Sequence, residues 1–398
     1  MKVQIQDITP KTLFKIVFAV YLLFGMHFKM DNLGGYGLYL SSNCMGWIFI
    51  SLLIGLGCWE IRNDGKIIFS RFQIICWIGI GLMCLPLLYS NNGNADLVVH
   101  RFLGLGAGLL VYSAFQQFRF NRQDRNWFLY FILGGILIQT FYGLSQHFLP
   151  LESWFEISVD RPFGVLAQKN VMATFLVTGA AISLFLLLKD ESVKEHKTKM
   201  WFIYSIPFLT SILYLPLQSR TGYLTFPLAI ALISILGYKK KKQLFIWLGL
   251  AIIGFLIGAY TPYKQRTEQN LKGAANFRKV CYQITFELCR KNPIIGVGYG
   301  SYFSSFRHYY AQRISEDPSI FAGTGNMDHP HNEILFWMVE GGIAPLIGLL
   351  IIAGGFLIMI WRAKSLEAWA AAGLVLPILI HTQLELPFYL SLIHWFLF

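Results

Sequence analysis

The residues with the clearest chemical potential form a short run, Asp328-His-Pro-His-Asn-Glu, directly before an apolar stretch. An imidazole titrates near pH ~6.5 and can take a proton from a hydroxyl group at neutral pH. One of the two histidines, His329 or His331, is therefore a candidate general base. Two other interpretations stay open. The run suits a polar helix N-terminus capped by Asn332 or Asp328, and it suits a zinc site, although no third ligand has a clear spacing.

Arginines recur at the ends of apolar stretches. An arginine at membrane depth is costly and marks function by default, and its guanidinium group binds phosphate in a bidentate manner. For any one arginine the alternative is a side chain that merely reaches up to the membrane interface. This alternative weakens because the predicted topology places four of them on the same, outer side of the membrane: Arg101, Arg161, Arg220 and Arg278.

Other polar groups accompany these arginines. Gln168 and Asn170 follow the segment Arg161-Pro-Phe-Gly. His381, Glu385 and Tyr389 repeat every four residues, which predicts one shared helix face until Pro387 disturbs it. Each of these segments therefore adds polar groups to the outer side.

The elements that must position these residues are membrane helices. Hydrophobic residues make up 55% of the 398 residues and charged residues only 14%, whereas a soluble domain carries roughly 25% charged residues. This composition excludes a soluble, a disordered or a disulfide-stapled protein. It predicts an all-α, polytopic integral membrane protein with about twelve spanning helices of about 20 residues each. The expected spans centre on residues 17–24, 47–57, 74–87, 103–113, 128–144, 172–188, 202–215, 224–236, 245–260, 335–360, 369–381 and 388–398.

The loops between these stretches alternate in lysine and arginine content. The basic set lies near residues 62–71, 119–125, 189–199, 239–242 and 362–364, which predicts that these loops and both termini are cytoplasmic. The first apolar stretch is interrupted by Lys15 and is expected to be retained as an anchor. The net charge of +12 mostly reflects this topology and does not indicate nucleic-acid binding, since the basic residues are scattered over separate short loops.

The longest outer segment is the loop 261–331, within a single membrane domain 1–398. Nine basic residues between Lys264 and Arg313 suggest an anionic partner at the outer surface. Residues 277–289 have the apolar spacing of an amphipathic helix. The following Gly296-Val-Gly-Tyr-Gly lacks a dinucleotide spacing and favours a tight turn or a close backbone approach, with a phosphate contact as the alternative.

Several of these motifs together resemble the superfamily of O-antigen ligases and O-antigen polymerases, bacterial inner-membrane proteins. The resemblance lies in Arg278 through the Asn292-Pro-Ile-Ile-Gly-Val-Gly turn, in His329-Pro-His331-Asn332-Glu333 followed by Glu340-Gly-Gly, and in Ser219-Arg220-Thr-Gly. The segments 161–170 and 381–387 look more like the bacterial protein O-oligosaccharyltransferases within that superfamily. The similarity extends over roughly residues 100–390.

The resemblance implies glycan transfer on the periplasmic face of the bacterial inner membrane. The donor would be a glycan on undecaprenyl diphosphate, transferred en bloc to a hydroxyl group of lipid A-core or of a pilin-like protein. Neither a cofactor nor a metal is expected, because the leaving group is already activated. The implied roles are diphosphate binding by Arg220 and Arg278 with Arg161 and Arg101 as helpers, proton abstraction by His331 or less favourably His329, and positioning by Gln168, Asn170, Glu385 and Tyr389.

Two alternatives stay open. An O-antigen polymerase would use the same chemistry on another lipid-linked glycan. A lipid-linked glycan flippase or transporter is the competitor from another class, but transporters often show internal repeats and polar groups at mid-membrane. This sequence shows no clear repeat, and its polar groups cluster in outer loops and at helix ends. That distribution favours an enzyme at the membrane interface.

Overall fold

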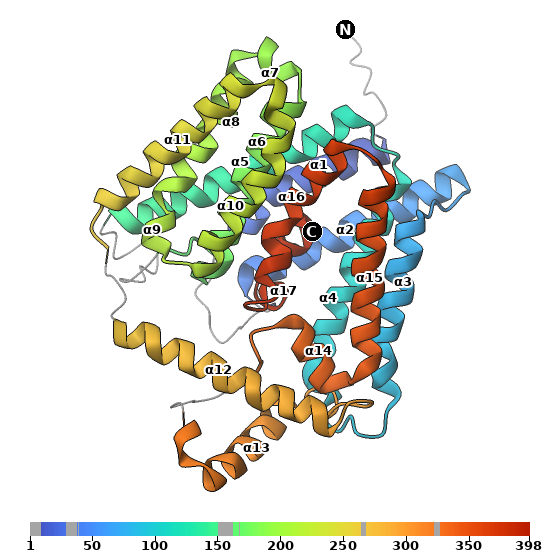
Figure 1. The fold of residues 1–398 in the computed structure, drawn as a ribbon. Coiled ribbons are helices and arrows are strands. Elements are labelled where there is room, and N and C mark those ends of the chain that lie inside the picture. The colour runs from blue at the N-terminus through green and yellow to red at the C-terminus, as the bar shows by residue number, and fades with distance from the viewer. Residues whose placement is uncertain are drawn as a thin grey trace.

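The computed structural model describes residues 9–28, 38, 40–149, 162–166, 168–263, 268–321 and 327–398, and every regular element among them is helical (Figure 1). The α-helices are α1 (Pro10–Leu23), α2 (Ser41–Asp64), α3 (Arg71–Cys84), α4 (Val99–Gln117), α5 (Arg122–Phe148), α6 (Lys169–Lys189), α7 (Ser192–Glu195), α8 (Lys197–Ile212), α9 (Tyr214–Leu217), α10 (Arg220–Ser234), α11 (Lys241–Tyr260), α12 (Glu268–Lys291), α13 (Tyr302–Glu316), α14 (Glu333–Gly341), α15 (Ile343–Arg362), α16 (Leu366–His381), α17 (Pro387–Leu390) and α18 (Leu392–Leu397). Short 3-10 turns η1 (Gly25–His27), η3 (Leu85–Leu88), η4 (Ala95–Val98), η5 (Ile235–Lys239) and η6 (Pro318–Ile320) extend or link them. The all-α prediction is confirmed.

Eight helices in the described part of the chain are long and apolar enough to cross a membrane. They are α2, α5, α6, α11 and α15, together with α3, α4 and α10 extended by their neighbouring 3-10 turns. The chain is therefore a polytopic membrane protein. Of the twelve predicted spans, two fall on shorter helices, α1 with 14 residues and α8 with 16. A third falls on the apolar helix α16, which also has 16 residues.

The last predicted span, 388–398, is not one helix. It folds as α17 and α18 of 4 and 6 residues, separated by Ser391 in an extended conformation. His394 in α18 is fully buried, and the Asn43 side chain of α2 bonds to the backbone on both sides of the break, at Leu390 O and Leu392 N. The segment packs into the bundle because these tertiary hydrogen bonds replace those of a continuous helix.

The predicted span 335–360 is also interrupted. Helix α14 ends at Gly341 and α15 starts at Ile343, because Gly342 has a φ of 71°, a conformation that side chains rarely adopt. A Cβ atom at Gly342 would collide with the carbonyl group of Ile294. The break lets residues 294–298 pair with the end of α14, with Val297 N donating to Val339 O at 2.8 Å and Gly298 N to Glu340 O at 2.9 Å.

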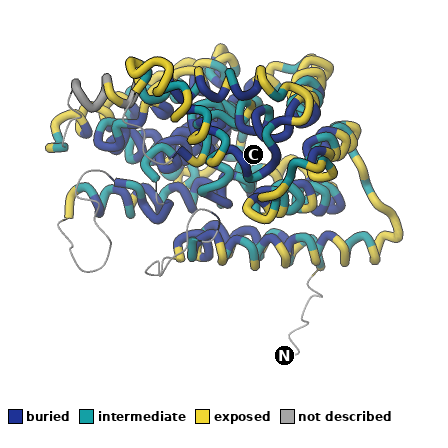
Figure 2. The backbone as a smooth tube through the Cα atoms, turned by 90° about the horizontal axis from the view of Figure 1, so that it is seen from below, coloured by how far each residue is buried: buried dark blue, intermediate teal, exposed yellow. Residues whose placement is uncertain are grey.

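The centre of the bundle is α6, in which every residue from Val171 to Leu188 is buried. Helices α5, α8, α10 and α16 surround it, and Trp247 of α11 reaches it by donating a hydrogen bond to Ser183 Oγ at 2.9 Å. Helices farther out carry exposed apolar side chains such as Phe255 and Leu350, which is the pattern of helices that face lipid. Figure 2 shows buried residues toward the middle and exposed ones around the outside.

Helices α12 and α13 lie at one end of the bundle, and the basic α6–α8 connection with α7 lies at the opposite end (Figure 1). The predicted amphipathic helix is confirmed within α12, where Val280, Cys281, Ile284 and Leu288 form a buried cluster with residues of α13 such as Tyr302. The loop 261–331 thus contains two packed helices. Between them, Gly296, Gly298 and Gly300 all have positive φ and touch backbone carbonyl groups, so the predicted close backbone approach is also confirmed.

Candidate active site

Three predicted residues meet at the end of the bundle that carries α12. His331 Nδ1 lies 2.7 Å from Glu385 Oε2, and Arg278 Nη2 donates to the other carboxylate oxygen, Glu385 Oε1, at 2.9 Å. Arg278 belongs to α12, His331 precedes α14, and Glu385 lies in the turn between α16 and α17. The tertiary fold therefore joins a candidate base, a carboxylate and a cation in one network.

Helix α14 holds this network in place through its N-terminus. Asn332 is the N-cap, since its Oδ1 accepts a hydrogen bond from Leu335 N at 2.9 Å, which confirms one of the two predicted caps. Its Nδ2 donates to Gln383 O at 3.1 Å, and Glu333 N donates to Thr382 O at 2.8 Å. These bonds tie the start of α14 to the turn that carries Glu385.

His331 adopts a strained backbone conformation, with a φ of 53°. A non-glycine residue in this region costs on the order of 1–3 kcal/mol, and such residues cluster at functional sites. Its N–H donates to His329 Nδ1 at 3.1 Å, and the Tyr282 hydroxyl group donates to its carbonyl oxygen at 3.4 Å. These bonds hold the backbone of His331 in this conformation.

The electrostatics of the network centre on the Glu385 carboxylate. Burial alone would raise the pKa of Glu385, but the hydrogen bond from His331 and the charge of Arg278 outweigh it and lower this pKa below its ordinary value. In the tautomer with its proton on Nδ1, His331 donates to an ionised Glu385 and leaves the Nε2 lone pair for a substrate. Burial and the neighbouring His331 lower the pKa of His329, which stays neutral at pH 7.

Glu385 is the third candidate metal ligand, which the spacing in the sequence did not reveal. Ligand atoms of His329, His331 and Glu385 lie within 4.8 Å of one another, so the three residues could hold a metal ion. Both oxygens of Glu385 already have partners, however, in His331 and Arg278. The arrangement as it stands is a histidine–carboxylate–arginine network.

One of the other predicted residues, Asn170, contacts the start of α10. Ser219 caps this helix through Gly222 N, and its hydroxyl group donates to Asn170 Oδ1 at 2.9 Å. Arg220 is exposed beside it and forms no ion pair with any described residue. Gln168 lies two residues before Asn170, and its buried Oε1 atom has no hydrogen-bond partner. Arg161 lies outside the described residues.

Two buried glutamines that were not predicted to be functional shape the segment before Gln168. Gln146 Oε1 accepts hydrogen bonds from Phe163 N at 2.9 Å and Gly164 N at 2.8 Å, and Gln139 Oε1 accepts from Val165 N at 3.1 Å. Both glutamines lie inside the apolar helix α5. A glutamine in an expected membrane span was the available signal, because a buried amide needs partners.

Arg101 is separate from the network of Arg278. It is 4% exposed and pairs with Glu340 of α14, while its guanidinium carbon lies 4.4 Å from the ring centre of Trp337 and 4.6 Å from that of Phe336. The other oxygen of Glu340 accepts hydrogen bonds from Gly300 N at 3.0 Å and Tyr302 N at 3.2 Å. Glu340 therefore links Arg101 to the glycine turn, a connection that sequence spacing could not reveal.

The predicted common face of His381, Glu385 and Tyr389 is wrong. Helix α16 ends at His381, and the chain turns before α17, so the three side chains diverge. His381 is buried against Thr174, with 2.8 Å between Nδ1 and Oγ1, and Tyr389 donates to Glu333 Oε1 at 3.1 Å. Only Glu385 contacts the histidine of the site.

Comparisons with known proteins agree with this assembly of motifs. Residues 205–353 match the family model described as O-Antigen ligase, and residues 162–187 match the one described as Protein glycosylation ligase. A General O-oligosaccharyltransferase of Acinetobacter baylyi (strain ATCC 33305 / BD413 / ADP1) is 25% identical over 254 residues, which cover 57% of this chain and 40% of that protein. The chain thus spans less than half of that relative. The matches confirm the resemblance to O-antigen ligases and protein O-oligosaccharyltransferases.

Proposed function

We propose that this chain, in keeping with the O-antigen ligase and protein glycosylation families that it matches, is an inner-membrane glycosyltransferase. It transfers a glycan en bloc from undecaprenyl diphosphate to an acceptor hydroxyl group on the periplasmic side. The observation that carries the proposal is the network of His331, Glu385 and Arg278, with the two contacts at 2.7 and 2.9 Å. It combines a base, the carboxylate that orients it, and a cation for a phosphate.

The reaction is a single displacement. His331 Nε2 takes the proton of the acceptor hydroxyl group while its oxygen forms a bond to the anomeric carbon of the donor sugar. The bond from that carbon to the phosphate oxygen breaks, and the diphosphate leaves with the electron pair. Negative charge therefore grows on the diphosphate in the transition state, where positioned cations are most effective.

Arg278 suits this charge because its side chain is 32% exposed and only one of its nitrogens is engaged by Glu385. Its other N–H groups remain for phosphate oxygens, in the fork geometry that guanidinium offers. Arg220, exposed at the N-terminus of α10, would contribute a second charge together with the free backbone N–H groups of that helix end. Gln168 and Asn170 would position the acceptor or sugar beside it.

The reaction needs no metal in this scheme. The diphosphate is already an activated leaving group, and Glu385 holds His331 by a hydrogen bond that a metal at the cluster of His329, His331 and Glu385 would have to break. Transfer should therefore continue at the same rate after EDTA treatment of the purified protein. A loss of transfer that zinc restores would contradict metal independence.

The orientation follows from the charge of the loops. The lysine-rich segments 189–199 and 239–242 lie at the end of the bundle away from α12 and α13 (Figure 1). If that end is cytoplasmic, as the positive-inside rule predicts, the network of His331, Glu385 and Arg278 faces the periplasm. This arrangement supports a donor that arrives from the periplasmic leaflet.

The decisive variant is His331→Ala. It should fold and insert normally, but its transfer rate should fall by about 10²- to 10⁴-fold, as expected for loss of a general base. His308→Ala is the matched control, because His308 is exposed on α13. Transfer is measured by incubating each purified variant with lipid-linked glycan and acceptor. Near-normal transfer by His331→Ala would overturn the proposal.

The acceptor is identified in cells that lack the gene. Loss of the long ladder from lipopolysaccharide gels identifies lipid A-core, and a mobility shift of a pilin identifies a protein acceptor. Lipopolysaccharide with a single repeat would instead indicate a polymerase. An unchanged glycan profile with donor accumulating on the cytoplasmic side would indicate a flippase and contradict the proposed transfer.

A further inference from the structure

Three side chains that can bind a metal ion meet at the candidate active site. Ligand atoms of His329, His331 and Glu385 lie within 4.8 Å of one another, and in the described part of the chain this is the one group of its kind. Two imidazoles and one carboxylate are the protein ligands of zinc sites that keep a fourth position open. The residues proposed to activate the acceptor hydroxyl group therefore have a second chemical capacity.

The two histidine rings are held close together by the turn that joins them. His331 N donates to His329 Nδ1 at 3.1 Å, and the ring centres lie 4.4 Å apart with an angle of 79° between the planes. This bond engages Nδ1 of His329, whose Nε2 forms no hydrogen bond with any described residue. Both side chains are 21% exposed, so an ion can reach them from solvent.

The spacing needs only a small adjustment to hold an ion. His331 Nδ1 and Glu385 Oε2 are 2.7 Å apart. Two ligands of a tetrahedral zinc ion, each about 2.0–2.2 Å from the metal, are separated by about 3.4 Å. A zinc ion would take the place of the proton between these two atoms, which would move apart by about 0.7 Å to match that separation.

The charges around the cluster also suit a cation. Asp328 Oδ1 lies 3.6 Å from His329 Nε2, and the Asp328 side chain is 64% exposed, so it can rotate to become a fourth ligand. Arg278 opposes a cation, but it contacts the other oxygen of Glu385 and is 32% exposed. Two carboxylates thus stand against one guanidinium group, and this balance favours a positive ion.

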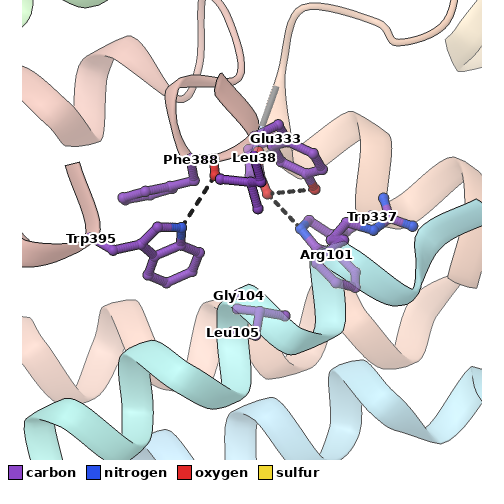
Figure 3. Close-up of a pocket in the computed structure, with 9 residues that line it drawn as sticks. Leu38, Arg101, Gly104, Leu105, Glu333, Trp337, Phe388 and Trp395 are labelled. Carbon is purple, nitrogen blue, oxygen red and sulfur yellow. Dashed lines mark hydrogen bonds between the residues drawn. The ribbon is translucent and has the colours of Figure 1, made fainter. Parts of the chain in front are cut away.

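Glu333, which follows His331 by two residues, does not take part. Its Oε1 accepts hydrogen bonds from Trp337 Nε1 at 2.6 Å and from the Tyr389 hydroxyl group at 3.1 Å (Figure 3). These residues line a hollow beside α4 with about 20 Å³ of space, which is room for about one water molecule. Glu333 is therefore bound within this neighbouring hollow and adds no ligand to the histidines.

We propose that the cluster of His329, His331 and Glu385 binds a zinc ion and that this ion inhibits glycan transfer. The inference rests on the proposed function and adds a regulation of the same site. A metal ion needs the lone pair of the nitrogen that it binds. When zinc binds His331 Nδ1, the proton of this nitrogen moves to Nε2. The ring keeps one proton, but Nε2 becomes a donor and no longer accepts the proton of the acceptor hydroxyl group.

The ligand chemistry selects the ion. Mg²⁺ and Ca²⁺ prefer oxygen ligands, whereas imidazole nitrogens suit zinc and the neighbouring transition metals. Mg²⁺ is therefore the appropriate control ion. The metal-free protein is the active form, as the proposed metal-independent transfer requires.

Zinc binding is measured on the full chain, purified in detergent without an affinity tag and freed of metal by EDTA and dialysis. Competition with a chromogenic zinc chelator should show one tightly bound zinc ion per chain that excess Mg²⁺ does not displace. His331→Ala should weaken binding by more than about 10- to 100-fold, the loss that removal of even an outer-shell partner causes. His308→Ala, exposed on α13, is the matched control and should bind zinc like the wild type.

Asp328→Asn provides a second measurement, because this exposed side chain lies outside the catalytic network. Its transfer rate without zinc should equal that of the wild type. Half-inhibition should need about three- to tenfold more zinc than in the wild type, as expected for loss of one weak ligand.

Three results would each overturn the inference: no stoichiometric zinc binding, equal zinc affinity of His331→Ala and the wild type, or an unchanged transfer rate of the zinc-loaded wild type. Zinc binding is measured without substrate. A chain that binds zinc at this cluster but transfers no glycan would therefore contradict the proposed function and keep the metal site. A chain that transfers glycan but binds no zinc would contradict only this inference.

Discussion

Two arginine–glutamate pairs lie at the two ends of the short helix α14, and their surroundings differ. The Arg101–Glu340 pair, near the end of α14, has side chains that are 3% and 2% exposed. The Arg278–Glu385 pair, next to the start of α14, has side chains that are 32% and 8% exposed. Arginine and glutamate thus have the same chemistry at both ends but not the same access to solvent or substrate.

The buried pair works mainly on the fold. Glu340 uses its second oxygen for Gly300 N and Tyr302 N, so the pair fastens the glycine turn to α14. The more exposed pair shares its carboxylate with His331 and leaves part of a guanidinium group accessible. Burial of an arginine in a membrane protein therefore does not by itself indicate a phosphate site. The carboxylate partner and the exposure decide what each arginine can do.

The largest effect should come from breaking the buried pair. Glu340→Ala leaves the Arg101 charge uncompensated and two backbone N–H groups of the glycine turn unpaired, which should cost about 3–5 kcal/mol of stability. Thermal melting of the detergent-purified variant measures the loss. Glu340→Gln should lose less, because an amide oxygen can still accept from Gly300 and Tyr302. Glu287→Ala, a partly exposed partner of Arg313, is the control.

A melting temperature of Glu340→Ala equal to that of Glu287→Ala would contradict the structural role of the buried pair.

The second effect concerns the pair at the other end. Glu385→Ala should leave a folded protein but lower the transfer rate by about 100-fold. In this variant His331 lacks the carboxylate that orients its ring and that holds its proton on Nδ1. The measurement combines a melting curve with a transfer assay. Glu385→Gln should recover part of the activity, because its amide oxygen can still accept from His331. Wild-type transfer by Glu385→Ala would show that His331 does not depend on this carboxylate.

The smallest effect tests the backbone strain at His331. His331→Gly and His331→Ala both remove the imidazole, but glycine adopts a φ of 53° without strain. His331→Gly should therefore be more stable than His331→Ala by up to about 1 kcal/mol. The free energy gained by relieving the backbone strain is expected to exceed the additional entropy that glycine loses on folding. Melting of the two variants under identical conditions provides the comparison. A lower stability of the glycine variant would show that the residue is not strained.

Local sequence patterns located the apolar helices but not the breaks within them. Apolar stretches predicted the membrane helices because a spanning segment must satisfy its own backbone hydrogen bonds in lipid. The cap at Asn332 and the close approach at Gly296, Gly298 and Gly300 were also predictable, since caps and positive φ depend on the residue itself. The interruptions at Gly342 and Ser391 were missed, because an apolar run looks the same whether one helix or two form within it.

The sequence by itself determined that this is a polytopic all-α protein with arginines, histidines and glutamates at its helix ends and loops. Only the tertiary structure decided which of these charges meet. The contacts Arg101–Glu340, Arg278–Glu385 and His331–Glu385 join residues 239, 107 and 54 positions apart. No periodicity extends over such separations, since the pairing depends on how the helices pack. Packing therefore separated the arginine that holds the fold from the arginine that stands beside the histidine.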